Sequence, residues 1–74
     1  MKITIENTSE MIEVSGDHVR ARVWEGETES GIRVQCLVIR LAVPEDEDQE
    51  EFARELREVA EPSGERAFPM RMLL

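Results

Sequence analysis

The chain has 74 residues, of which 17 are acidic and nine are basic, so that its net charge is −8. A chain this short forms a single domain, residues 1–74, with a thin core. The excess of acid argues against direct binding to nucleic acid, because such binding requires Lys and Arg to neutralise phosphates. Residues 45–74 carry ten acids against four bases, which favours a partner with a basic surface.

The start of the chain and its single cysteine predict a cytoplasmic protein. The first ten residues, MKITIENTSE, contain neither an apolar signal-peptide core nor the start of an apolar membrane span. Cys36 cannot form an internal disulfide, and its apolar neighbours predict a small buried residue in a reducing compartment.

Alternation of apolar and polar residues predicts three strands in the first part of the chain. Residues 2–6 and 11–15 are expected to form a hairpin around the turn-forming residues 7–10, with Ile5 opposite Ile12. Gly16 and Asp17 then predict a tight turn into a third strand at residues 18–25, with Val14 opposite Val19 and Ile12 opposite Ala21.

Residues 31–44, GIRVQCLVIRLAVP, are predicted to form the central strand because they are rich in β-branched residues. The polar loop at residues 26–31 leads into it, and Val23 is expected opposite Val34. The apolar phase then changes near Cys36, which indicates either a β-bulge or burial on both faces. The leftover apolar face requires cover by the C-terminal segment, by a second copy of the chain or by a partner. It comprises Leu37, Ile39, Leu41 and Val43.

After Pro44 the apolar period becomes helical, with Phe52, Leu56 and Val59 on one stripe. Asp48 and Glu51 predict the start of this helix, and residues 62–64 predict its end. Residues 68–74 alternate again and predict a fifth strand. The expected fold is therefore α+β with the order ββββαβ: a four-stranded antiparallel meander, one helix packed on its Ile, Val and Cys face, and a C-terminal strand.

The sequence offers no catalytic, cofactor-binding or metal-binding set, so we do not expect an enzyme. His18 is the only histidine and is predicted beside a turn, which leaves no credible triad. Asp46, Asp48 and Glu50 are spaced like the start of a calcium loop. That match fails because Glu51 stands where glycine is needed and Arg57 where glutamate is needed.

Two surface features are candidates for partner binding. The first is a set of acids that either caps and solvates the helix or imitates phosphates in a basic groove: Glu45, Asp46, Glu47, Asp48 and Glu50. The second is Trp24 with Arg20, Arg22 and Arg33, which are expected together on the outer sheet face. These residues either cover the sheet with arginine stems or form an interface hot spot.

Three stretches, MKITIENT, ARVWEGETESGIRV and FPMRMLL, resemble a family of small uncharacterised accessory proteins of phages and prophages. The resemblance implies the cytoplasm of a host cell as the setting. It also implies a protein-binding role, such as inhibition of a host nucleic-acid-handling or defence protein, CRISPR effectors included. The alternative is an assembly component of a phage particle that acts through subunit contacts. A homodimer is expected for the inhibitor, because a second copy of the chain is one way to cover the apolar face that the monomer leaves exposed.

Overall fold

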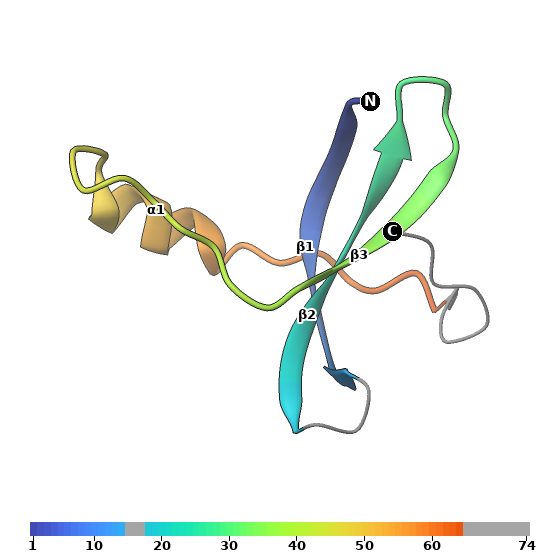
Figure 1. The fold of residues 1–74 in the computed structure, drawn as a ribbon, viewed down its shortest axis with the longest axis horizontal. Helices are drawn as coiled ribbons and strands as arrows, with labels where there is room; N and C mark the ends of the chain where they lie inside the picture. Colours follow the sequence, from blue (N-terminus) through green and yellow to red (C-terminus); the bar gives the residue numbers. More distant parts are fainter. Residues whose placement is uncertain (15–17, 65–74) are drawn as a thin grey trace.

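The computed structural model describes residues 1–14 and 18–64, which form three antiparallel strands and one short helix (Figure 1). The sheet has the order β1-β2-β3, from β1 at Ile3–Val14, β2 at Val19–Thr28 and β3 at Arg33–Val38. The helix, α1, spans Gln49–Leu56. The predicted ββββαβ order with a four-stranded meander is therefore wrong. The fifth strand predicted at residues 68–74 and the turn at Gly16 and Asp17 lie outside the described residues.

The two strands predicted at residues 2–6 and 11–15 are one strand, β1, interrupted by a bulge. Asn7 lies opposite Trp24 and Met11 lies opposite Arg22, so β1 holds two more residues than β2 between these pairs. Residues 8–10 take up the excess, and because the excess is two residues, Asn7 and Met11 keep the same face of the sheet. The polar residues at this point therefore form a bulge rather than a hairpin turn.

Hydrogen bonds from two other parts of the chain hold the bulge in place. The Thr8 hydroxyl donates to the Val23 carbonyl at 2.7 Å, and the Arg22 guanidinium donates to the Thr8 carbonyl at 2.7 Å. Ala60 forms a parallel bridge with Thr8: its N–H donates to the Asn7 carbonyl at 2.9 Å, and its carbonyl accepts from Ser9 N–H at 3.1 Å. The bulge is thus where the segment after the helix joins the sheet.

The predicted register of residues 11–15 with residues 18–25 is confirmed, whereas the two other predicted registers are wrong. Ile5 lies opposite Gly26 and not opposite Ile12. Ile12 lies opposite Ala21 and Val14 opposite Val19, as predicted. Val23, however, lies opposite Leu37, three residues beyond Val34. Because three is an odd number, the shift exchanges the two faces of β3, and Val34, Cys36 and Val38 lie on the same face as Trp24.

The register differs because β2 continues past the predicted loop. Gly26 lies within β2, opposite Ile5, where an added Cβ would overlap the Thr4 carbonyl. The turn into β3 comes only after Thr28, which donates its N–H to the Ile32 carbonyl at 2.9 Å. Gly31 completes this turn with a positive φ of 90°.

The helix begins where the sequence predicts and ends earlier. Asp48 is the N-cap, and its Oδ1 accepts the Glu51 N–H at 2.9 Å. The helix stops at Leu56 because the Leu56 carbonyl accepts the Asn7 side-chain amide at 2.9 Å and Ala60 is bonded to the bulge. Residues 57–64 therefore cross the sheet instead of extending the helix (Figure 1).

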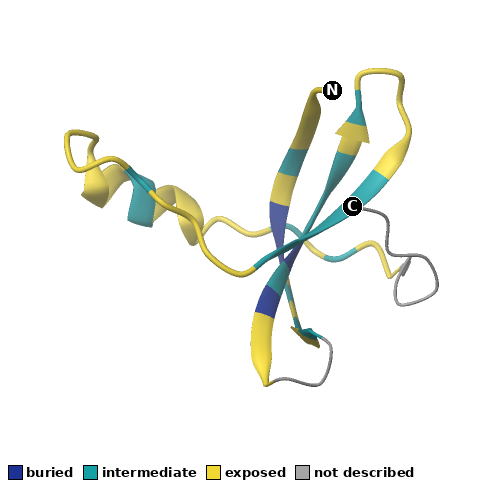
Figure 2. Ribbon diagram, viewed as in Figure 1, coloured by how far each residue is buried: buried dark blue, intermediate teal, exposed yellow. Residues whose placement is uncertain are grey.

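The core is small and lies where the strands cross (Figure 2). Among the described residues, Ala21 and Val23 are the buried apolar side chains, and Asn7 and Thr8 are the buried polar ones. The helix stands to one side of the sheet rather than over the face that carries Ala21 and Val23 (Figure 1). The predicted packing of the helix on that face is therefore wrong.

Candidate functional site

An open apolar cleft lies between the sheet and α1, and we call it the Trp24 cleft. Its volume is about 240 Å³. It is lined by Met11, Arg22, Trp24, Val38, Ile39, Arg40, Leu41, Phe52 and Leu56.

The strand register builds the floor of the cleft. On the face that carries Trp24, Arg22 of β2 lies between Met11 of β1 and Val38 of β3. After β3 ends, Ile39, Arg40 and Leu41 continue along the rim. Leu37 lies opposite Val23 on the other face, whereas Ile39 and Leu41 follow the end of β3 at Val38 and line the cleft.

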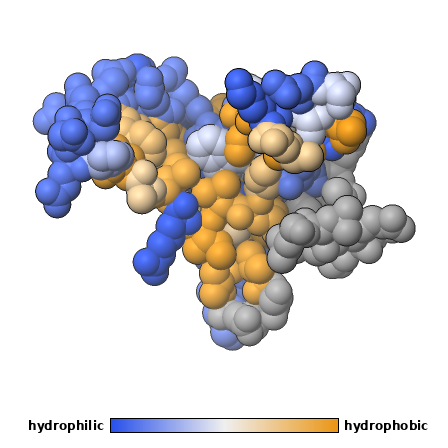
Figure 3. All heavy atoms as spheres, turned by 45° about the horizontal axis from the view of Figure 1, so that its top comes forward, coloured by the Kyte–Doolittle hydropathy of each residue, from blue (hydrophilic) through white to orange (hydrophobic). Residues whose placement is uncertain are grey.

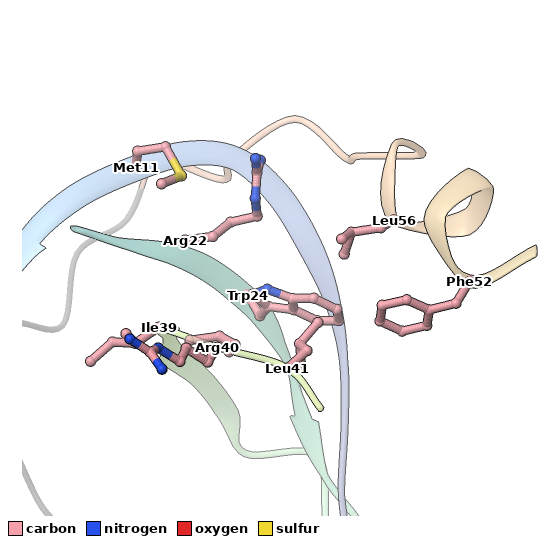
Figure 4. A pocket seen from close by; sticks show the side chains of 9 residues that line it. Met11, Arg22, Trp24, Ile39, Arg40, Leu41, Phe52 and Leu56 are labelled. Atoms are coloured by element: carbon pink, nitrogen blue, oxygen red, sulfur yellow. The ribbon is translucent and has the colours of Figure 1, made fainter. Parts of the chain in front are cut away.

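The helix supplies the other wall. Phe52 and Leu56 are four residues apart, so they lie on one side of α1. Both side chains point toward Trp24 and Leu41 (Figure 4). The bond from the Asn7 amide to the Leu56 carbonyl fixes the end of this wall against β1.

Much of this apolar surface is open to solvent. The exposed fractions are 54% for Ile39, 47% for Leu41 and 37% for Leu56. The space-filling view shows apolar atoms running from the sheet to the helix, with hydrophilic atoms beyond them on the helix side (Figure 3). Exposed apolar side chains that cluster inside a polar border are typical of a protein-binding surface.

The three predicted arginines do not all lie on one face of the sheet. Arg22 and Arg20 share the Trp24 face, as expected, but the Arg22 guanidinium is bonded to the Thr8 carbonyl and so has a structural role. Arg33 lies on the opposite face, because it is opposite Glu27 and acts electrostatically on Glu25. The prediction that Arg33 shares a face with Trp24 is therefore wrong, and the shifted register is the reason.

The acidic residues lie in an ordered loop before α1. The Gln49 side chain donates to the Pro44 carbonyl at 2.7 Å, and Glu47 N–H donates to the same carbonyl at 3.1 Å. Asp48 is occupied as the N-cap, whereas Glu51 and Glu58 are paired with Arg54. Within the described part of the chain, four of the acids have no side-chain partner: Glu45, Asp46, Glu47 and Glu50.

The sequence had indicated Trp24 and the acids but had not indicated the cleft between them. Phe52 and Leu56 were predicted to cover the opposite face of the sheet, and Met11 had no assigned role. The signal in the sequence was that Ile39 and Leu41 belong to an apolar face for which the predicted fold offered no cover.

The described residues contain neither a metal centre nor a membrane-spanning helix. In residues 1–14 and 18–64, no group of three or more His, Cys, Asp or Glu side chains is placed to hold a metal ion. No helix in these residues is long and apolar enough to cross a membrane.

Comparison with protein-family models, with curated proteins and with solved structures finds no match for this chain. The geometry of the Trp24 cleft and the charges beside it are therefore the guide to function.

Proposed function

We propose that this is a protein-binding protein that takes apolar side chains of a partner into the Trp24 cleft. The observation that carries the proposal is the exposed apolar lining that the sheet and helix build together. Its volume of about 240 Å³ is below the roughly 300–1,000 Å³ of typical small-molecule sites. A space of this size suits one or two large side chains, and Trp with Arg is a common composition of interface hot spots.

The free carboxylates next to the cleft give the partner its expected charge. Glu45, Asp46, Glu47 and Glu50 lie just before or within the first turn of α1, the element that also carries Phe52. A partner that fills the cleft therefore meets negative charge at its border, and a basic surface would be attracted there. The net charge of −8 adds to this attraction at long range.

The resemblance to phage accessory proteins supports an inhibitory role. Host proteins that handle nucleic acids carry basic surfaces, and an acidic protein that covers such a surface blocks it. The acidic loop would supply the attraction, and the Trp24 cleft would supply the specific contact. Assembly of a phage particle through apolar contacts is the second candidate, favoured by the exposed apolar residues, and it differs in its salt dependence.

The test begins with capture of a partner from host lysate and continues with affinity measurements on the purified pair. Leu41→Glu places a charge on the exposed rim of the cleft and should weaken binding by more than about tenfold. Ile32→Glu is the matched control, because Ile32 is 63% exposed and lies in the β2–β3 turn outside the cleft. Equal affinity of wild type and Leu41→Glu would overturn the proposal.

The acidic loop is tested with Asp46→Asn, Glu47→Gln and Glu50→Gln combined, which leaves the cap at Asp48 intact. This variant should weaken binding strongly at low salt and little at high salt, because screening removes the same attraction. An affinity that is independent of salt in both proteins would favour the apolar assembly contact instead. The emission of Trp24, the only tryptophan, reports directly on occupation of the cleft.

A further inference from the structure

Within residues 1–14 and 18–64, nothing pairs with the outer edge of β1 before Asn7. The sheet order places β1 at the edge, and within the described residues the only pairing beyond it is the bridge of Thr8 with Ala60. The Asn7 carbonyl points outward, since it accepts the Ala60 N–H. Backbone groups in a strand alternate in direction, so the N–H and C=O groups of Ile3 and Ile5 point outward too.

The side chains along this edge are divided by face. Ile3 and Ile5 share the face of Trp24, because Ile5 is opposite Gly26 and Asn7 is opposite Trp24. Lys2, Thr4 and Glu6 lie on the other face. Glu6 is directly opposite Glu25, which is an unfavourable pairing of like charges, and no described cation forms an ion pair with Glu6.

We propose that two copies of the chain pair through this edge, antiparallel, with the two-fold axis at Thr4. Ile3 of each copy then faces Ile5 of the other, and their outward N–H and C=O groups form four hydrogen bonds. Lys2 of each copy lies opposite Glu6 of the other, which gives two identical ion pairs across the seam. The edge is thus complementary to itself in backbone, charge and apolar side chains.

Neighbouring registers lose part of this complementarity. An axis at Ile5 would bring Ile3 opposite Asn7 of the second copy, whose carbonyl is already bonded to Ala60. It would also place Lys2 opposite Thr8 instead of a carboxylate. An axis at Ile3 would leave Glu6 beyond the paired residues.

The dimer would join two three-stranded sheets into one of six strands. Ile3, which is 40% exposed, and Ile5 would pack against their copies, and both Trp24 clefts would open on the same side of the sheet. Pairing of five residues per chain buries less than the roughly 1,200–2,000 Å² of a standard stable interface. We therefore expect a concentration-dependent dimer that forms at micromolar concentrations or above.

Charge exchange provides the decisive test, with sedimentation equilibrium of the whole chain carrying a C-terminal tag. Lys2→Glu and Glu6→Lys each replace both ion pairs of the dimer by pairs of like charge. Each variant should raise the dimer dissociation constant by about tenfold or more. An equimolar mixture of these two variants should form a heterodimer, since residues 2 and 6 then carry opposite charges in both pairs. The double variant K2E/E6K should dimerise like the wild type.

Two controls separate this edge from other modes of association. Glu29→Lys changes the net charge as Glu6→Lys does but lies in the β2–β3 turn, so it should leave the dimer unchanged. Leu41→Glu should also leave it unchanged, because it alters the Trp24 cleft instead. Hydrogen exchange of the Ile3 and Ile5 amides should slow with concentration, while the Thr4 and Glu6 amides, already bonded to β2, should not. A monomer at all concentrations, or a dimer that persists in Lys2→Glu, would overturn the proposal.

Discussion

Glu25 connects three parts of the chain through one carboxylate. Its Oε2 accepts the Ser63 hydroxyl at 2.8 Å and the Gln35 amide at 2.9 Å, and its Oε1 accepts the Ser63 N–H at 3.1 Å. These bonds favour the charged form, so the pKa of Glu25 lies below the ordinary glutamate value, with the Ser63 side chain as the main cause and Gln35 as the second. Glu25 thus ties the segment after the helix to β2 and β3.

The lowered pKa makes part of the stability dependent on pH. Because the folded-state pKa lies below the unfolded value of about 4.5, the contribution is present above that pH and is lost as the pH falls through the folded-state pKa. Glu25→Gln should cost about 1 kcal/mol near neutral pH, and the difference from wild type should shrink in acid. Urea denaturation at a series of pH values measures it. Glu27→Gln serves as the control, and a difference that is constant with pH would contradict the expectation.

At the scale of the element, α1 depends on its cap more than on its packing. It has eight residues and no buried side chain, and isolated helices of this length are unstable in water. The bond from Asp48 Oδ1 to Glu51 N–H satisfies one of the free amides of its first turn. The Trp24 cleft therefore has one rigid wall, the sheet, and one wall of low intrinsic stability.

Asp48→Ala should destabilise the helix by about 0.5–2 kcal/mol and lower the helical circular dichroism signal. The sheet should remain folded, because it makes few contacts with α1. Asp48→Asn should behave as wild type, since asparagine is an equally good cap. Asp46→Ala removes an acid of the same loop that does not cap. An equal loss of helix in Asp46→Ala would show that charge rather than capping stabilises the helix.

At the scale of the whole molecule, the chain is more extended than usual for its length. Its radius of gyration is 13.4 Å, whereas about 11 Å is expected for 74 residues in a compact domain. The helix beside the sheet and the small core account for the difference (Figures 1 and 2). Stability should therefore be concentrated in few side chains.

Val23 is fully buried in β2, the middle strand, and its carbonyl accepts the Thr8 hydroxyl. Val23→Ala removes two buried methyl groups and should cost about 2 kcal/mol, a large fraction of the stability of so small a domain. Val19→Ala, in the same strand but 38% exposed, should cost well under half as much. Chemical denaturation of the two variants measures the ratio of these two free-energy costs. Equal costs would show that the core extends beyond Ala21 and Val23.

The sequence by itself determined the features that depend on near neighbours. The register of Ile12 and Val14 across the first hairpin, the cap at Asp48 and the helical face of Phe52 and Leu56 follow from alternation, local hydrogen bonding and helical spacing. Each needs only residues within a few positions of one another.

Tertiary structure alone decided where these elements lie. Polar residues 7–10 could form a turn or a bulge, and the bulge is selected by bonds from Ala60, Arg22 and Val23, which are distant in the chain. The bonding of Ala60 and the bond from the Asn7 side chain to the Leu56 carbonyl also end the helix at Leu56. The register of β3 likewise depends on how far β2 continues, and that choice moves Cys36 and Val38 from one face to the other. The Trp24 cleft results from these long-range choices, so no local pattern could have predicted it.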